Sequence, residues 1–150
     1  MTTEQMQSHL SELRTRGHER CVVCAPSHPL GLRVEYHVGA DGVVHAEFAC
    51  HRVFQGYPGQ LHGGVITALL DGAMTNCLFA YGIQAVTGEL TVRFVRPVVP
   101  DRVAEVNARL TKTFRRMYVL EAEMIQEQVT VARAQGKFLK RPMGDRAEAL

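Results

Sequence analysis

The stretch that most restricts how this chain can fold is residues 63–80, GGVITALLDGAMTNCLFA. Its apolar side chains point in nearly every direction around a helix axis, which predicts a long helix from Gly63 to Ala80. A helix that is apolar on all sides is a buried helix. A single flat sheet cannot cover it, so we expect either a sheet that curls around the helix or a second subunit that covers part of it.

The rest of the chain carries mostly the period-two alternation that is typical of strands. Two strands are predicted on either side of a Gly-Ala-Asp-Gly turn, and three or four long antiparallel strands are predicted after the helix. The predicted strands cover 32–38, 43–49, 89–97, 102–110, 116–126 and 129–140. This order predicts an α+β fold in which a long antiparallel sheet wraps around one central helix.

The length of 150 residues suits one domain with a single core. A weakly amphipathic helix is predicted over residues 3–16, so residues 1–19 are expected to form an N-terminal extension. Residues 20–141 form the predicted domain, and the polar residues 142–150 are expected to be a loose tail.

The composition excludes several classes of partner. Apolar residues make up 46% and charged residues 21% of the chain, which is the balance of a globular protein. The net charge of +2 implies no strong field that would attract a nucleic acid or a membrane. No segment is expected to span a bilayer, and the N-terminus lacks an apolar signal-peptide core. We therefore expect a cytoplasmic protein without nucleic-acid or membrane partners.

Two of the four cysteines, Cys21 and Cys24, form a Cys-x-x-Cys pair near the start of the domain. A zinc site needs about four ligands, and here Cys50, His51 or His28 would have to complete it. The simpler interpretation is a pair of structural thiols, so we assign no metal and no cofactor. A disulfide scaffold is not expected in an intracellular chain of this size.

Asp71 is the one acidic residue in the apolar helix. A buried carboxylate costs free energy unless it is paired or used in chemistry. Its side chain could be hydrogen-bonded to a neighbouring backbone group or to a hydroxyl such as that of Thr67 or Thr75, which would give it a purely structural role. The alternative is a catalytic acid or base.

The start of the same helix is suited to binding an oxygen atom. The first N–H groups of a helix lack partners within it and carry partial positive charge. At Gly63 and Gly64 no side chain prevents a ligand oxygen from approaching these groups. They could form an oxyanion hole for acyl transfer or a cradle for a phosphate. His62, just before them, could assist binding, orient the loop or simply pack at the helix start.

The spacing of these residues predicts a dimer. Eight residues separate Gly63 from Asp71, which is about 12 Å of helix rise. A reacting carbon must lie roughly 3 Å from both the oxyanion donor and the catalytic group. One helix cannot place both at one carbon, so Gly63 or Gly64 of one subunit is expected to face Asp71 of the other. The chain has no Gly-x-Ser-x-Gly elbow, phosphate-binding loop or dinucleotide fingerprint.

Three stretches of the chain resemble the sequence pattern of a known family. FQGYPGQLHGGVITALLDGAM (54–74) resembles the signature of PaaI-like hotdog-fold thioesterases, which is roughly F-x-G-x-P-G-x-x-H-G-G followed by an Asp. CVVCAPSHPLGL (21–32) resembles the opening of one branch, which includes vertebrate mitochondrial acyl-CoA thioesterases, although His28 replaces the usual Asn. AVTGELTVRFVRPV (85–98) is similar to the first long strand after the helix. The resemblance covers about residues 20–140.

The resemblance implies a hotdog fold, homodimers that often pair into tetramers, and hydrolysis of an acyl-CoA thioester to free acid and CoA. It implies that Asp71 is the general base or nucleophile and that Gly63 or Gly64 polarises the carbonyl. His62 would support the loop, and Thr87 would position water or the carboxylate. Gln55 lies near the place where one branch has a functional Asn. The CoA phosphates would need cations, for which the candidates are Arg96, Arg115, Arg116, Lys140 and Arg141. The acyl pocket would be lined by residues such as Leu70, Met74 and Leu78.

Two other functions remain open from the sequence. The first is a hotdog protein that binds acyl-CoA without hydrolysing it, although a pure binding protein has no need of Asp71. The second is an enoyl-thioester hydratase or dehydratase on the same fold, a group that arranges its His and acidic residue differently on the helix.

Overall fold

The computed structural model describes residues 1–141 of the chain, and the predicted tail at 142–150 lies outside these described residues. The elements in chain order are α1 (Thr3–Gly17), β1 (His37–Val38), β2 (Val44–Ala49), a short 3-10 helix (Arg52–Phe54), α2 (Gly63–Ala80), β3 (Ala85–Phe94), β4 (Val103–Thr113), β5 (Met117–Gln126) and β6 (Val129–Lys140).

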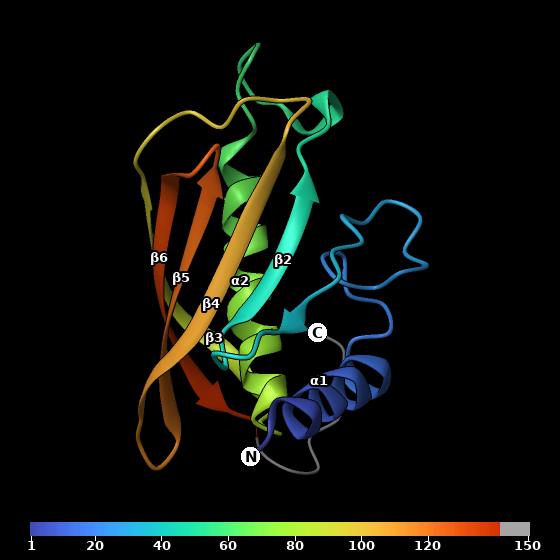
Figure 1. The fold of residues 1–150 in the computed structure, drawn as a ribbon, viewed down its shortest axis with the longest axis vertical. Helices are drawn as coiled ribbons and strands as arrows, with labels where there is room; N and C mark the ends of the chain where they lie inside the picture. The colour runs from blue at the N-terminus through green and yellow to red at the C-terminus, as the bar shows by residue number, and fades with distance from the viewer. Residues whose placement is uncertain (142–150) are drawn as a thin grey trace, which may run out of the picture.

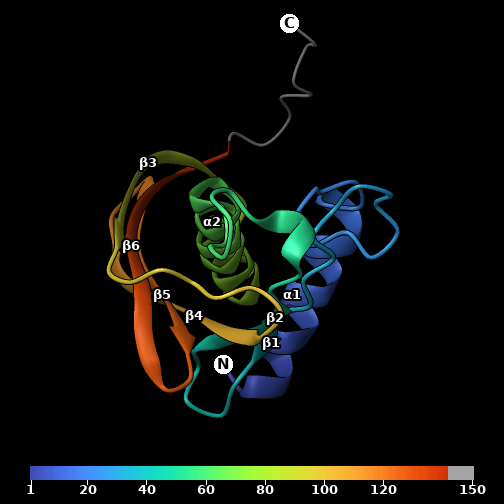
Figure 2. The same ribbon diagram turned by 90° about the horizontal axis from the view of Figure 1, so that it is seen from above.

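The six strands form one antiparallel sheet in the order β1-β2-β4-β5-β6-β3. The sheet curls around α2, as the view from above shows most clearly (Figures 1 and 2). This confirms the predicted α+β fold with a long sheet wrapped around one central helix. The strand that follows α2 crosses to the far edge of the sheet, so β3 pairs with β6 alone among the described strands.

Small residues on the inner face of the sheet leave room for α2. Ala108, Ala122 and Ala134 lie in one cross-strand row over β4, β5 and β6, and all three are buried. At Gly136 a Cβ atom would lie only 3.1 Å from the Sδ atom of Met74. The helix can therefore lie close to the sheet, and its large side chains fill the space between the small ones.

The N-terminal extension packs on the side of α2 that the sheet leaves uncovered (Figure 2). Thr2 caps α1 by accepting a hydrogen bond from the N–H of Gln5, whose side chain accepts one from the N–H of Thr2 in return. Met6 and Leu10 are buried in the same core cluster as the sheet residues. Residues 1–19 thus share the core of the domain that follows them.

The predicted strand at 32–38 is largely wrong, because only His37 and Val38 join the sheet. The preceding residues pair locally instead: the N–H groups of Leu32 and Val34 donate to the carbonyls of Val22 and Val23. This local pairing lays residues 20–36 along α2 as an irregular segment. The other predicted strands agree with the structure to within a few residues at their ends.

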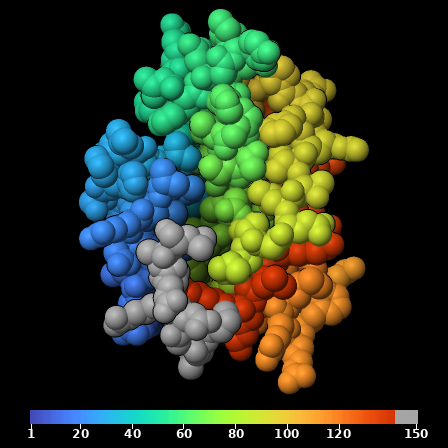
Figure 3. Space-filling view, turned by 180° about the vertical axis from the view of Figure 1, so that it is seen from behind, coloured from blue at the N-terminus to red at the C-terminus, as the bar shows by residue number. Residues whose placement is uncertain are grey.

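The central helix forms over the predicted residues and is mostly covered. Its length and mean hydropathy of 1.3 reach the level of a membrane span, contrary to our expectation that no segment would do so, but 61% of it is buried inside this fold. A core helix meets the same criterion. One stripe stays partly open, and it includes Gly64, Thr67, Ala68 and Asp71. In Figure 3 this side of α2, in green, lies in a hollow between the blue N-terminal segment and the yellow β3.

Candidate active site

The first turn of α2 has one N–H group left for a ligand. His62 is the N-cap residue, and its Nδ1 accepts a hydrogen bond of 2.8 Å from the N–H of Gly64. The N–H groups of Val65 and Ile66 both donate to the carbonyl of His62. Within residues 1–141 the N–H of Gly63 has no acceptor. The hydrogen bonds therefore distinguish the two glycines, since the N–H of Gly64 is already paired and the N–H of Gly63 is free.

Gly63 also lines a cavity of about 340 Å³ at this end of the molecule. The wall opposite is the connection after β3, from Phe94 to Val98, and Arg96 supplies the one cation of the lining. A Cβ atom at Gly63 would lie 3.4 Å from the ring of Phe94. The free N–H is thus next to a mainly apolar space with a positive charge at its edge.

Asp71 lies on the open stripe of α2 and is held from outside the helix. The hydroxyl of Thr87, on β3, donates to its Oδ1 at 2.7 Å. Thr67, one of the two helical hydroxyls considered from the sequence, donates to the carbonyl of Gly63 instead. No hydrogen bond joins Thr75 to the carboxylate. The pairing of Asp71 with Thr87 brings together two residues that the resemblance placed in one site.

The environment of Asp71 disfavours its charged form. Burial raises the pKa of its carboxyl above the ordinary value, while the hydrogen bond from Thr87 lowers the pKa and so opposes that rise. The charge of Cys21 raises the pKa slightly more, and His18 lowers it. A carboxyl whose pKa is raised is a stronger base when ionised and is better matched to accepting a proton in a reaction.

The other predicted site residues lie in different places. The Oε1 of Gln55 accepts a hydrogen bond from the N–H of Gly59, so its side chain closes the exposed loop before α2. Arg115 and Arg116 form the turn between β4 and β5, at the opposite end of the molecule from the start of α2 (Figure 1). Lys140 lies beside them, because its N–H donates to the carbonyl of Arg116. Arg141 follows, with its N–H donating to the carbonyl of Gln84.

The proposed acyl-pocket residues are in the core. Leu70 and Met74 are fully buried, Leu78 is nearly so, and none of the three lines the cavity beside Gly63. Their role in binding an acyl chain stays a prediction.

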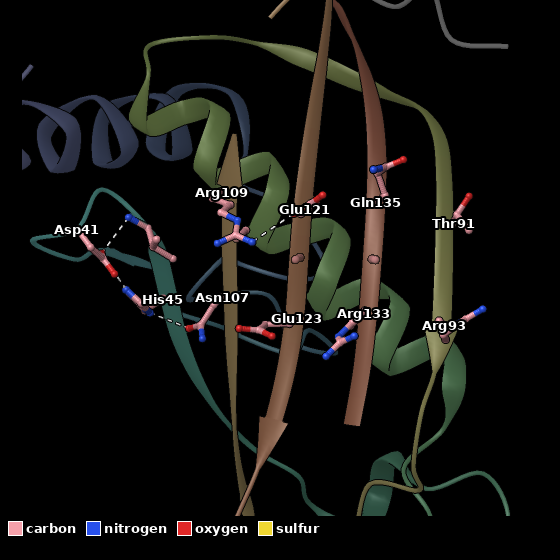
Figure 4. Close-up of a pocket in the computed structure, with 14 residues that line it drawn as sticks. Asp41, His45, Thr91, Arg93, Asn107, Arg109, Glu121, Glu123, Arg133 and Gln135 are labelled. Atoms are coloured by element: carbon pink, nitrogen blue, oxygen red, sulfur yellow. Dashed lines mark hydrogen bonds and ion pairs between the residues drawn. The ribbon is translucent and has the colours of Figure 1, made fainter. Parts of the chain in front are cut away.

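A larger hollow of about 680 Å³ lies on the outer face of the sheet (Figure 4). A row of polar side chains crosses it in register from β2 to β3: His45, Asn107, Glu123, Arg133 and Arg93. The alternation of the strands places this row on the face away from α2. None of the predicted catalytic residues lines the hollow, so it is separate from the site at Asp71.

The Cys-x-x-Cys pair has a partner that the sequence analysis missed. His18, at the end of α1, lies with Cys21 and Cys24 in one cluster, whereas Cys50, His51 and His28 are not part of it. Hydrogen bonds from Cys24 and His18 lower the pKa of Cys21 to about 3, and the pKa of the buried Cys24 is raised by its bond to Cys21. The His-x-x-Cys-x-x-Cys spacing could have indicated His18, because a local hydrogen bond from the N–H of Cys21 to the carbonyl of His18 joins the two residues.

Known proteins resemble this chain in both sequence and structure. Residues 58–133 match the Thioesterase superfamily. The acyl-coenzyme A thioesterase THEM4 of Bos taurus is 33% identical over 88 residues, which are 57% of this chain and 36% of the bovine protein. The Mus musculus protein of the same name is 31% identical over 88 residues, which are 38% of its length. The matches thus span little more than a third of these curated relatives.

Two solved structures illustrate the likeness of the fold. The E. coli PaaI protein, from the phenylacetic acid degradation operon, is 19% identical with a TM-score of 0.79, and the match covers 95% of this chain and 97% of that protein. A hypothetical thioesterase protein of Streptococcus pneumoniae, solved with coenzyme A, is 20% identical with a TM-score of 0.67, and the match covers 72% of this chain and 85% of that protein. The chain therefore belongs to the thioesterase superfamily and has the PaaI-like hotdog fold that its sequence resembles.

Proposed function

We propose that this protein hydrolyses an acyl-CoA thioester to a free acid and CoA. The observation that carries the proposal is the half-buried carboxylate of Asp71, held by the hydroxyl of Thr87 on the open stripe of an otherwise apolar helix. The free N–H of Gly63 at the start of the same helix supports it. The thioesterase names of the bovine and mouse relatives, and the coenzyme A in the streptococcal structure, support the substrate class.

The chemistry follows from the two groups. The N–H of Gly63 donates a hydrogen bond to the thioester carbonyl oxygen and stabilises the negative charge that develops there. The carboxylate of Asp71 takes a proton from a water molecule, which attacks the carbonyl carbon. The C–S bond then breaks, and the CoA sulfur leaves and is protonated. Thr87 occupies Oδ1 of the carboxylate, which leaves Oδ2 to accept the proton. Direct attack by Asp71 on the carbonyl carbon is the alternative route.

The complete site needs two protomers. Gly63 and Asp71 are about 12 Å apart along one helix, whereas both must reach one carbon. The outer edge of β3 has no strand partner within the described residues and carries the exposed apolar side chains of Val86 and Phe94. Antiparallel pairing of two β3 edges would continue the sheet and bring the open stripes of two α2 helices together. Gly63 of one protomer would then face Asp71 of the other. Pairing of such dimers into tetramers, and a cytoplasmic location, stay predictions.

The same pairing would collect the basic residues. Arg96 lies at one end of β3, and Arg116 and Lys140 lie at the other. An antiparallel pair brings the first end of one protomer to the second end of its partner. Arg96, Arg115, Arg116 and Lys140 would then border one site, where they could bind the phosphates of CoA.

The experiment is thiol release from a panel of acyl-CoA substrates with short, medium, long and aromatic acyl groups. The wild type is compared with Asp71→Asn, which keeps an oxygen for the Thr87 hydroxyl, and with Glu121→Gln, which removes a carboxylate from the outer hollow. We expect Asp71→Asn to lose about 10²- to 10⁴-fold in turnover, the usual contribution of a general base, and Glu121→Gln to keep it.

Three outcomes would contradict the proposal. A loss of only a few fold in Asp71→Asn would remove Asp71 from the reaction. Tight binding of acyl-CoA without thiol release by the wild type would favour the binding protein. Addition of water to an enoyl thioester without thiol release would favour the hydratase.

A further inference from the structure

The cluster of His18, Cys21 and Cys24 lies outside the proposed hydrolytic site and has the composition of a metal site. One ligand atom from each residue lies within 4.8 Å of the other two, and the Nδ1 of His18 is 3.8 Å from the Sγ of Cys24. Zinc binds Cys sulfur at about 2.3 Å and His nitrogen at about 2.0–2.1 Å in tetrahedral geometry, so neighbouring ligand atoms lie about 3.5–3.8 Å apart. The cluster needs only a small contraction to reach that spacing.

We propose that His18, Cys21 and Cys24 bind a Zn²⁺ ion. Imidazole and thiolate ligands in this mixture are the ones that zinc prefers. The charge also agrees, since two thiolates balance the ion in a place where Cys24 is buried. The proposal is independent of the proposed thioesterase function.

The residues around the cluster hold its ligands in place. The N–H of Val23 donates to the Sγ of Cys21 at 3.4 Å, a contact that stabilises a thiolate. The ring of His18 packs edge-on against Phe79 of α2, with 4.9 Å between the ring centroids, which limits its rotation. His18 also caps the end of α1, where the helix dipole favours the positive charge of a bound cation.

One buried atom beside the cluster has no hydrogen-bond partner. Asn76 is fully buried on α2, and its side chain lies within hydrogen-bonding reach of Cys24. Its Nδ2 donates to the carbonyl of Gly72, but its Oδ1 is unpaired. Three protein ligands leave a fourth position on zinc, which water commonly occupies. A zinc-bound water would supply the donor that the oxygen of Asn76 lacks.

Zinc at this place would join two neighbouring parts of the fold. The ligands come from the end of α1 and from the irregular segment that follows it, and both rest on α2. The ion would therefore act as a cross-link that stabilises the N-terminal third of the protein.

The test is metal binding by the full chain, purified under reducing conditions with zinc present. We expect one zinc ion per chain after dialysis, and a lower Tm after removal of the ion by a chelator. Cys21→Ser, Cys24→Ser and His18→Ala should each lose most of the bound zinc. Cys50→Ala and Cys77→Ala, which change buried cysteines outside the cluster, should keep it.

A second measurement does not depend on the variants folding. Titration of the metal-free wild type with Co²⁺ should give the sulfur-to-cobalt absorption band and visible bands of a tetrahedral site, and added Zn²⁺ should abolish them. The proposal is overturned if the reduced wild type takes up neither ion. It is also overturned if the double variant that lacks both Cys21 and Cys24 binds as much zinc as the wild type. Recovery of a Cys21–Cys24 disulfide, with no metal uptake after its reduction, would also overturn it.

Discussion

At Asp71 the folded protein holds a proton more tightly than the unfolded chain does. Burial raises the folded-state pKa above the ordinary value of 3.8. The tighter binding of this proton stabilises the fold. This stabilisation is fully present below the pKa of Asp71 in the unfolded chain and is lost as the pH rises through its pKa in the folded protein. The ionised carboxylate thus lowers the stability of the fold at neutral pH, where the proposed reaction uses it.

This cost leads to a prediction about stability. Asp71→Asn replaces the ionised group with a neutral one of the same shape, so it should raise the Tm at neutral pH even though we expect it to lower turnover. The gain should shrink as the pH falls and Asp71 of the wild type becomes protonated. Thermal unfolding of the wild type and the variant over a range of pH measures this difference in Tm. A variant less stable than the wild type at neutral pH would contradict the assignment of the raised pKa.

The hydroxyl of Thr87 opposes the effect of burial, and its removal should be visible in a pH profile. Thr87→Val keeps the shape of the side chain but removes the donor, so the pKa of Asp71 should rise further. The acidic limb of kcat/KM should move to higher pH, because the base must lose its proton to act. Thr87→Ser should keep the wild-type profile. Identical profiles for the Val and Ser variants would show that this hydrogen bond does not tune the base.

At the scale of elements, α2 was predicted with its full length because its pattern is local and unambiguous. The choice between Gly63 and Gly64 could not be predicted, since it depends on the direction in which the His62 ring turns. The irregular course of residues 32–36 was also missed. Its alternation suits a strand, but Arg33 adopts a positive φ of 54° and the segment pairs with its own neighbourhood.

Gly72 allows that irregular segment to lie on α2. A Cβ atom there would lie 2.6 Å from Cγ1 of Val23 and 2.8 Å from the hydroxyl oxygen of Tyr36, which is itself bonded to the carbonyl of Leu69. Gly72→Ala should therefore destabilise the protein by about 1–3 kcal/mol, as overpacking does elsewhere. Chemical denaturation measures this loss in the free energy of unfolding. Gly17→Ala serves as the control, because a Cβ atom at this end of α1 meets no neighbour closer than ordinary van der Waals contact and should not destabilise the protein. Equal stability of the two variants would mean that the segment moves aside freely.

At the scale of the whole molecule, the arrangement of the sheet around α2 could be predicted from the order of patterns, whereas the dimer expected from the spacing of Gly63 and Asp71 stays a prediction. The packing of α1 could not, because it depends on a tertiary contact that leaves little trace in a weakly amphipathic sequence. His18 lies with the two cysteines for a local reason, since the N–H of Cys21 donates to its carbonyl.

A shared site predicts that two inactive variants can restore each other. In a mixed dimer of Asp71→Asn with Gly63→Val, one of the two sites combines the intact Gly63 of one chain with the intact Asp71 of the other. Random exchange of subunits makes half of the dimers mixed, so about a quarter of the wild-type activity should return. Activity of the mixture is measured after refolding the two chains together. Mixed dimers that are present but inactive would place both residues of a working site in one chain.

The place of β3 in the sheet also sets when the site can form during synthesis. Thr87 is paired with Phe138 on β6, the last strand of the described chain, although Asp71 lies at the middle of the sequence. While the ribosome is still adding the residues of β6, the strand that carries Thr87 has nothing to pair with in its own chain. Contacts so distant in sequence form late in folding. A nascent chain therefore contains both Asp71 and Thr87 long before it contains the strand that β3 pairs with, and a fragment that ends before β6 has both residues without the pairing that positions the hydroxyl.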